Sequence, residues 1–369
     1  MRTTSNGAEW ARPRHPMPPR LRPTTLLSKL SVRRLRSIAK WVNSRTSAHT
    51  DAPSTKWSVC SVQTSHFRRY VVCIMLNENQ LALFENGQGF IAALDQNGGS
   101  TPNALKMYGI DPTMYSSELE MFDRIQDERA RIITSAVFRS DKILATILFQ
   151  DTLKRSIDGI PVPTYLWEEK GIVPFLKIDN GLADQENGVQ LMREISDLDS
   201  TLAGAKAAGI MGTKARSVVH SANAVGVDQI IDQQFALAER VLAADLLPIL
   251  EPEADIKALD KVEAEVLLKA ALLDRLEHLG DRQIAVKISI PTIDGFYSDL
   301  MEHPNVARVV ALSGGYERPD ACARLARNKG LIASFSRALL DGLSVRQSQE
   351  LFNQVLDASI DAIYRASTT

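Results

Sequence analysis

The chain has 369 residues, 44% of them hydrophobic, and a formal net charge of −1, which fits a globular protein with at least one full-sized core. No stretch approaches the roughly 20 consecutive apolar residues that a membrane-spanning helix needs, which argues against a membrane protein. The three cysteines, Cys60, Cys73 and Cys322, are too few for a disulfide framework and fit a reducing compartment.

The charge is distributed unevenly along the chain. Residues 1–74 hold 14 Lys and Arg against two acids, Glu9 and Asp51, which gives this segment a net charge of +12. Since the whole chain carries −1, the remaining 295 residues carry −13. An acidic folded part has no overall electrostatic footprint for nucleic acid, so any phosphate site must be local.

The basic head is rich in Arg, Ser, Thr and Pro, a composition that resembles an organellar transit peptide. One alternative is an upstream start codon included in error, with the protein beginning at Met75; an arm that binds nucleic acid is a third interpretation. We expect a disordered basic extension over residues 1–74 and a folded domain over residues 75–369. The expected location is the cytoplasm, or an organelle if the head is a transit peptide.

From Gly89 onward, short apolar runs rich in β-branched residues alternate with longer helical patterns, which is typical of a parallel sheet built from strand–helix units. The eight expected strands are residues 89–95, 142–150, 172–179, 209–219, 246–253, 284–291, 306–315 and 331–339. The clearest helical patterns cover residues 187–208, 227–244, 257–279 and 345–364. Eight strands in this length favour the α/β class and a (β/α)₈ TIM barrel over an open sheet.

Polar residues interrupt the apolar runs near their C-terminal ends. They are Asp95, Lys177, Lys214, Glu251 and Lys287, and the last four follow one another at intervals of 37, 37 and 36 residues. Each strand–helix unit of a parallel barrel returns the chain to the same face, so this spacing gathers the side chains around one mouth. Active sites of barrels lie there.

The run Ala285 to Pro291 is the most informative strand. Alternation points Val286 and Ile288 outward, toward the helices, and Lys287 into the barrel. A lysine inside an apolar strand is costly unless a carboxylate pairs with it or its pKa is lowered, and a lowered pKa would make it a nucleophile. The strand pattern alone leaves both possibilities open.

Two further strands carry pairs of charged residues two positions apart, which places each pair on one face. Lys214 and Arg216 form a cationic pair, so at least one of them must meet an acid or an anionic substrate group. Glu251 and Glu253 form an acidic pair, and a carboxylate beside a lysine suits proton transfer. The alternative is a layer of structural salt bridges inside the barrel. It would explain the charges but not the phosphate features that follow.

Candidate phosphate-binding residues follow the last two strands, where barrels commonly hold a phosphate. Ser313 and Gly314 follow the seventh strand, and Ser336 and Arg337 end the eighth. Glycine lets backbone N–H groups approach an anion closely, and the Arg337 guanidinium can bind it through two hydrogen bonds. A second glycine-rich turn, residues 97–100, follows Asp95.

These runs together resemble the class I fructose-1,6-bisphosphate aldolases, most closely their short bacterial-type branch, over nearly all of residues 89–366. The runs AALDQNGGS, FLKIDNG, GTKARSV, ILEPE, VKISIP, ALSGG and ASFSRAL appear in the order of that family. One such run would mean little, whereas seven in order are specific.

The resemblance implies a role for each matching residue. Lys287 would form the Schiff base with the substrate ketone, Asp95 would handle the proton of the C4 hydroxyl, and Glu251 would be the acid and base for carbinolamine dehydration. Lys214 would tune the charge beside Glu251, and Glu253 would orient the lysines. The residues expected to bind phosphate are Ser313, Gly314, Ser336 and Arg337 at one end and Lys177, Arg216 and Ser100 at the other.

An iminium is an electron sink, so the resemblance implies no cofactor and no metal. The zinc-dependent aldolases use histidine ligands instead, whereas His220, His278 and His303 lack ligand spacing and are expected to be surface or helix residues. The expected partners are small sugar phosphates, with no nucleic acid and no membrane, and we also expect a homo-oligomer of unspecified size.

The chain departs from the family pattern at two points. Animal enzymes end in a tyrosine that helps to protonate the enamine, whereas Tyr364 lies in a helical run and is expected to be a packing residue, so the proton donor is unassigned. Ser336 stands where the family often has glycine. Two other functions stay open: another Schiff-base barrel enzyme, such as a deoxyribose-phosphate aldolase or a transaldolase, and a non-catalytic scaffold that binds polyanions.

Overall fold

The computed structural model describes residues 78–96 and 101–369, all of which belong to one compact unit. Its barrel strands are β1 (Phe90–Leu94), β2 (Ile143–Leu148), β5 (Val173–Lys177), β7 (Gly212–Val219), β8 (Leu247–Ala254), β9 (Ile284–Ser289), β10 (Val306–Leu312) and β11 (Ile332–Phe335). Each lies within one of the eight expected runs or extends one residue past it. The expected boundary between residues 74 and 75 lies outside the described residues and stays a prediction.

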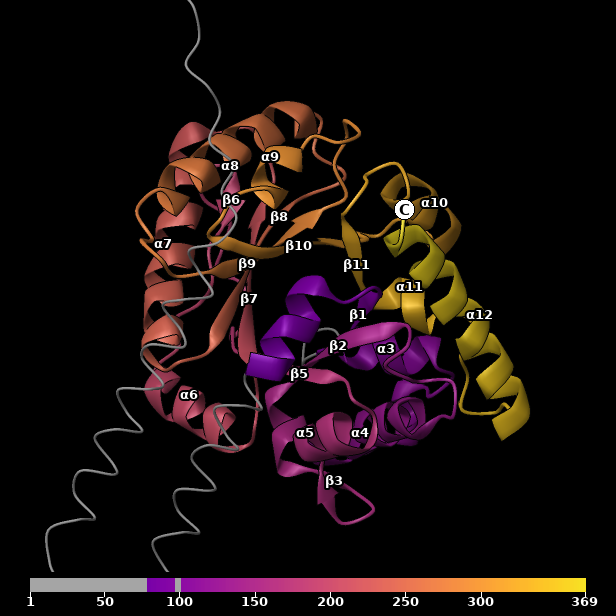
Figure 1. Cartoon of the computed structure of the whole chain (residues 1–369). Coiled ribbons are helices and arrows are strands. Elements are labelled where there is room, and N and C mark those ends of the chain that lie inside the picture. Colours follow the sequence, from indigo (N-terminus) through magenta and orange to yellow (C-terminus); the bar gives the residue numbers. More distant parts are fainter. Residues whose placement is uncertain (1–77, 97–100) are drawn as a thin grey trace, which may run out of the picture. The chain divides into compact units, whose positions relative to one another are not determined.

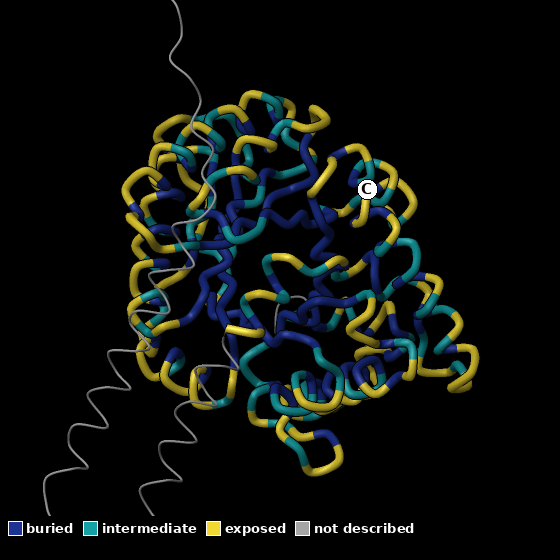
Figure 2. The backbone as a smooth tube through the Cα atoms, viewed as in Figure 1, coloured by how far each residue is buried: buried dark blue, intermediate teal, exposed yellow. Residues whose placement is uncertain are grey.

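The eight strands pair in parallel around a closed ring in the order β5-β2-β1-β11-β10-β9-β8-β7, and β5 pairs with β7 to complete it. The predicted TIM barrel is therefore confirmed. Figure 1 shows α6, α7 and α8 along one side of the barrel and α12 along the other. The burial pattern agrees, because the strands are buried and the helices expose their outer faces (Figure 2).

Helices and short segments connect the strands. The longer helices are α4 (Glu118–Thr134), α6 (Leu198–Ala207), α7 (Ala224–Ala243), α8 (Lys261–Leu276), α10 (Arg318–Leu325) and α12 (Gln349–Ser367). The shorter ones are α3 (Thr101–Met107), η1 (Pro112–Met114), η2 (Gln150–Lys154), α5 (Val162–Thr164), η3 (Tyr165–Glu169), α9 (Ser298–Met301) and α11 (Arg337–Leu340). The remaining strands are β3 (Ser156–Ile157), β4 (Ile160–Pro161) and β6 (Val189–Gln190).

Several expected boundaries differ from the structure, and two of the differences have a clear structural reason. The helix expected from residue 187 begins only at Leu198, because Asn187 and Gly188 adopt positive φ angles of 49° and 72° in a turn that leads into β6, and β6 pairs antiparallel with β7. The eighth strand ends at Phe335 rather than residue 339, and Arg337 begins α11 instead of closing the strand.

The apolar residues form two clusters, one on each side of the barrel wall. Outward residues such as Phe90, Val286 and Ile288 pack against the helices, which confirms the outward direction expected for β9. Inward residues such as Ile249 and Ala285 fill the barrel together with Phe84, from a helix over residues 78–86. Apolar side chains therefore fill the interior of the barrel, and polar residues occupy the C-terminal ends of the strands.

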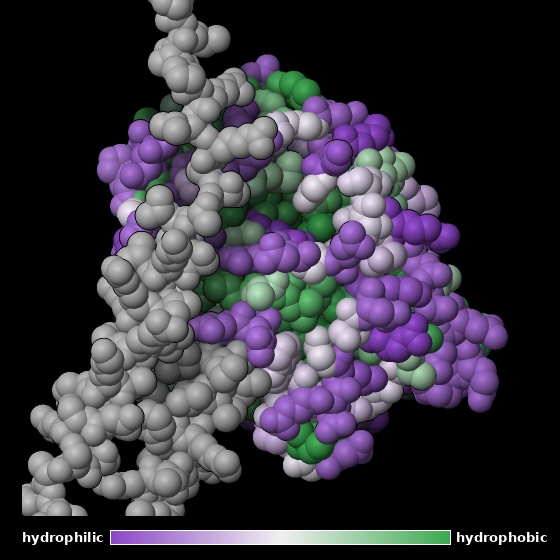
Figure 3. Space-filling model, in the orientation of Figure 1, coloured by the Kyte–Doolittle hydropathy of each residue, from purple (hydrophilic) through white to green (hydrophobic). Residues whose placement is uncertain are grey.

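The distribution of hydrophilic and hydrophobic residues on the surface agrees with the barrel and its outer helices. On the face shown in Figure 3, hydrophilic residues cover the outer helices, and hydrophobic residues are seen mainly in the recessed central part. Within residues 78–96 and 101–369, none of the helices combines the length and the hydrophobicity that crossing a bilayer requires.

Candidate active site

A cavity of about 960 Å³ opens at the C-terminal ends of the barrel strands, a volume at the upper end of the range for small-molecule sites. Its lining brings together nearly all of the residues expected from the sequence: Asp95, Lys177, Lys214, Arg216, Glu251, Glu253, Lys287, Ser313, Gly314, Ser336 and Arg337. The remaining one, Ser100, lies outside the described residues.

Strand register explains why charged residues from different strands meet here. Lys177 of β5 lies opposite Lys214 of β7. Ile249 of β8 lies opposite Ala285 of β9, so two residues further along each strand Glu251 and Lys287 share one level and one face. Glycine is required at position 212 of β7, because a Cβ atom there would lie 2.1 Å from the backbone oxygen of Leu247.

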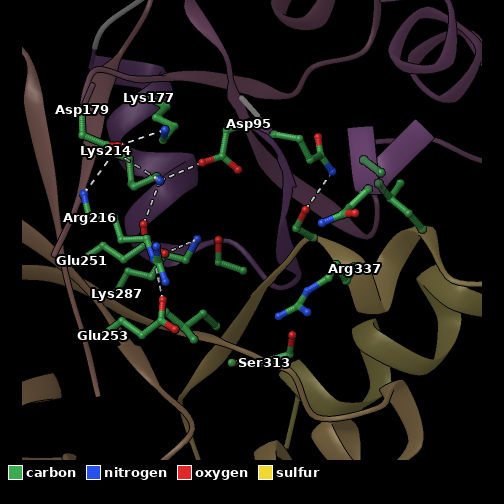
Figure 4. A pocket seen from close by; sticks show the side chains of 18 of the residues that line it. Asp95, Lys177, Asp179, Lys214, Arg216, Glu251, Glu253, Lys287, Ser313 and Arg337 are labelled. Atoms are coloured by element: carbon green, nitrogen blue, oxygen red, sulfur yellow. Dashed lines mark hydrogen bonds and ion pairs between the residues drawn. The ribbon is translucent and has the colours of Figure 1, made fainter. Parts of the chain in front are cut away.

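Lys214 lies at the centre of the charged group (Figure 4). Its Nζ lies 2.7 Å from Oδ2 of Asp95, 2.8 Å from Oε2 of Glu251 and 3.8 Å from Oδ2 of Asp179. The lysine is 2% exposed. Three carboxylates around one buried ammonium hold it in place and fix its distance from the two acids that the resemblance assigns to chemistry.

Lys287 approaches the same glutamate from the next strand. Its Nζ lies 2.8 Å from Oε1 of Glu251, so the two oxygens of this carboxylate each face a different lysine. Lys287 is 4% exposed and Glu251 is 3% exposed. The carboxylate pairing that the strand pattern left open is therefore present, and the same lysine lines the cavity.

Burial and charge act in opposite directions on the acids and on the central lysine. Burial alone would raise the pKa of Asp95, but the ammonium groups of Lys214, Lys287 and Lys177 bring it well below its ordinary value. For Glu251 too, burial raises the pKa and Lys214 and Lys287 more than offset this, so it is lowered. Burial lowers the pKa of Lys214, yet its acidic neighbours raise it above the ordinary value. At neutral pH both acids are ionised and Lys214 is cationic.

Two cations expected at the second phosphate end already have acidic partners. Nζ of Lys177 lies 2.9 Å from Oδ1 of Asp179, and Nε of Arg216 lies 2.6 Å from Oε2 of Glu253. Glu253, which the resemblance expects to orient the lysines, forms its ion pair with Arg216, and its role toward the lysines stays a prediction.

The opposite wall of the cavity carries a cation without an acidic partner. Arg337 forms no ion pair with any residue in the described ranges, and it lies with Ser313 across the cavity from the lysines (Figure 4). Gly314 has φ +63°, and a Cβ atom there would lie 2.5 Å from Cγ2 of Ile256, so this turn requires glycine. An unpaired guanidinium beside a glycine turn can bind a phosphate.

None of the three histidines in the described ranges lines the cavity that holds the lysines. His220 follows β7 and lies between Oδ2 of Asp255, at 3.1 Å, and Oε1 of Gln190, at 2.8 Å, on the wall of a smaller neighbouring cavity of about 340 Å³. Residues 78–96 and 101–369 contain no group of three or more side chains arranged to hold a metal ion.

Curated relatives decide the family. No protein-family model matches the sequence. The chain is 52% identical over 294 residues to the class 1 fructose-bisphosphate aldolase of Synechocystis, over 79% of this chain and 98% of the relative. It is also 52% identical to that of Clostridium acetobutylicum, over 80% of this chain and all of the relative. The chain belongs to the class I fructose-bisphosphate aldolases.

A third aldolase and a solved structure agree with this assignment. The class 1 aldolase of Porphyromonas gingivalis is 49% identical over 79% of this chain and 99% of its own length. The fructose-bisphosphate aldolase of Plasmodium falciparum superposes with a TM-score of 0.62 at 19% identity, over 86% of this chain and 98% of that chain. At that identity the superposition supports the barrel fold.

This aldolase also contains site residues that the sequence reasoning missed. Asp179 pairs with Lys177, and it accepts a hydrogen bond of 3.2 Å from the backbone N–H of Arg216. Its position two residues after Lys177 could have revealed it, because alternation puts both on one face. Gln96 donates a hydrogen bond of 2.8 Å to Oγ of Ser336, and thereby links the residue after Asp95 to the residue before Arg337.

Arg129 of α4, another residue that was missed, supports the same loop. Its guanidinium is 1% exposed and donates to the backbone oxygen of Gln96 at 2.5 Å and to Oγ1 of Thr152 at 3.1 Å. No strand pattern could identify it, since it lies on a helix. Tyr364 is partly buried and packs against the outer core, as expected.

Proposed function

We propose that this chain catalyses the reversible aldol cleavage of fructose 1,6-bisphosphate to dihydroxyacetone phosphate and glyceraldehyde 3-phosphate through a Schiff base on Lys287. The observation that carries the proposal is the shared carboxylate, because Glu251 lies 2.8 Å from Lys287 and 2.8 Å from Lys214 at the mouth of the barrel. Membership of the class I aldolases supports the same reaction.

The first steps form the imine. Ionised Glu251 takes a proton from the ammonium of Lys287, and the neutral amine attacks the C2 carbonyl of the substrate. The carbinolamine then loses its hydroxyl as water when Glu251 returns the proton to it, which leaves an iminium. Lys214 stays cationic beside Glu251 and stabilises the carboxylate whenever it is ionised.

Cleavage of the C3–C4 bond follows. Ionised Asp95 accepts the proton of the C4 hydroxyl, the C4–O bond becomes a carbonyl, and the electrons of the C3–C4 bond move into the iminium to give a neutral enamine. Glyceraldehyde 3-phosphate leaves. Protonation of the enamine at C3 and hydrolysis of the imine then release dihydroxyacetone phosphate and restore Lys287.

Phosphate groups would hold the substrate at its two ends. Arg337, Ser313, Gly314 and the backbone at Ser336 are suited to the phosphate nearer the ketone. Lys177 and Arg216, each beside a carboxylate, remain candidates for the other end together with Ser100. We propose sugar phosphates as the partners, a homo-oligomeric assembly, and the cytoplasm as the location, which the low cysteine count supports.

Cleavage of fructose 1,6-bisphosphate in the presence of EDTA tests the proposed reaction. Because the iminium stabilises the carbanion, we expect full turnover after dialysis against EDTA, followed as the release of glyceraldehyde 3-phosphate in a coupled assay. Added Zn²⁺ should leave the rate unchanged. Loss of activity in EDTA that Zn²⁺ restores would instead require the metal-dependent mechanism, and the absence of cleavage under both conditions would reject the function.

A further inference from the structure

A buried glutamate outside the group of charged residues described above also lines the cavity. Glu128 lies on α4 and is 3% exposed. It belongs to the part of the cavity wall that α3 and the following turn provide, together with Asn103, Lys106, Met107 and Tyr108. The catalytic steps above do not use this residue, and the sequence reasoning did not select it.

Within residues 78–96 and 101–369 the carboxyl group of Glu128 has no polar partner. Its Oε2 atom is fully buried without a hydrogen-bond partner, whereas Oε1 is not fully buried, and no described residue forms an ion pair with either oxygen. The nearest charged neighbour in the chain, Arg129, directs its guanidinium to Gln96 and Thr152 instead. An unpartnered buried carboxyl costs free energy, and native proteins rarely retain one without a role.

Burial also sets the charge of this carboxyl. It raises the pKa of Glu128 to about 8, although the positive charge of Arg129 opposes the shift. At pH 7 most molecules therefore carry a neutral carboxylic acid, which can donate a hydrogen bond. Above pH 8 the group becomes a carboxylate, which can only accept one.

Other ionisable groups also line the cavity. They are Tyr108 and Lys106 on the α3 side, Asp95 after β1, Arg337 on α11, the lysines of β5, β7 and β9, and Asp179, Arg216, Glu251 and Glu253. Burial raises the pKa of Tyr108, that of Asp95 is far below its usual value and that of Lys214 is above it. These three keep their charge state between pH 7 and 9.

We propose that Glu128 is a substrate-binding residue, whose neutral carboxyl group donates a hydrogen bond to an oxygen atom of the sugar phosphate at the α3 side of the cavity. The inference rests on the proposed function for the identity of the ligand. Phosphate oxygens and sugar hydroxyls are both acceptors, whereas an ionised carboxylate would repel a phosphate dianion.

Binding of hexitol 1,6-bisphosphate tests this proposal. The compound lacks the keto carbon, so its affinity reports on contacts and not on imine formation, and its phosphates are already dianions above pH 7 because their second pKa is about 6. We expect calorimetry to show that the affinity of the wild-type chain falls roughly tenfold between pH 7 and 9. The fall reflects the loss of one hydrogen bond and the gain of a repulsive charge.

Glu128→Gln separates binding from structure. The amide donates a hydrogen bond at every pH, so the variant should match the wild type at pH 7 and keep that affinity at pH 9. The matched control is Asp127→Asn, because Asp127 is exposed on the same helix and its variant should retain the wild-type fall. Hexitol 1-phosphate shows which group accepts the hydrogen bond from Glu128. If the affinity for this ligand does not fall with pH, the acceptor is the second phosphate; if it still falls, the acceptor is a hydroxyl or the first phosphate.

The proposal is overturned if wild-type affinity is constant between pH 7 and 9, or if Glu128→Gln shows the same fall as the wild type. If Glu128→Gln does not fold, as judged by circular dichroism, Glu128→Ala takes its place, and an Ala variant whose affinity still falls between pH 7 and 9 overturns the proposal. Cleavage of fructose 1,6-bisphosphate by the wild type is measured separately, so failure of the proposed reaction and failure of this binding role give different results.

Discussion

Lys287→Ala is expected to lower kcat for fructose 1,6-bisphosphate by roughly 10⁴-fold or more, because removal of a covalent nucleophile removes the reaction path itself. The fold should persist. Glu251 keeps its contact of 2.8 Å with Lys214, so no carboxylate is left buried without a partner, and the stability cost should be about 1–3 kcal/mol.

Steady-state kinetics and thermal unfolding together check this prediction. Lys329→Ala is the matched control, since Lys329 is exposed and does not line the cavity; it should retain wild-type turnover. A Lys287→Ala variant that is folded and loses less than tenfold in kcat would show that another group forms the intermediate.

Asp95→Asn is expected to slow cleavage by roughly 10²- to 10⁴-fold, the range for loss of a general base, while imine formation continues. The amide preserves the shape of the side chain but cannot accept the C4 proton. Lys214 retains Glu251 and Asp179 as acidic partners, at 2.8 and 3.8 Å, and Lys287 retains its contact of 2.8 Å with Glu251.

Two rates measured on the same variant separate the steps. Cleavage is followed as release of glyceraldehyde 3-phosphate, and imine formation as borohydride-dependent incorporation of labelled dihydroxyacetone phosphate. Glu251→Gln should give the converse pattern, with imine formation itself impaired, because the amide cannot shuttle the proton. Equal loss of both rates in Asp95→Asn would argue against the division of roles between the two acids.

Barrel architecture could be predicted because each strand leaves a strong local signal. The runs around Ala285 and Val310 are apolar and β-branched, as are six others, and the number of such runs indicated a closed barrel. The segment from Asn187 to Asp197 was misjudged. Asn187 and Gly188 have positive φ angles in a turn after which the chain pairs with β7. The spacing of apolar residues, from which the helix was predicted, does not reveal such a turn.

Some site residues could likewise be predicted from the sequence and others could not. Lys214, Glu251 and Lys287 could be found because polar residues in apolar strands are conspicuous and alternation fixes their direction. The partner of Arg216 could not be foreseen, since two acids two residues apart look equivalent until the register of β7 against β8 is known. Glu128 resembles any exposed glutamate of a charged helix, and only the packing of α4 in the folded structure buries it.

Reductive trapping tests the central claim most directly. The wild-type chain is mixed with dihydroxyacetone phosphate and sodium borohydride, and the modified peptide is identified by mass spectrometry. The account predicts one adduct per chain, on the Nζ atom of Lys287, and none without the ketone. Modification of Lys214 or of another lysine in place of Lys287, or an unmodified chain, would contradict it.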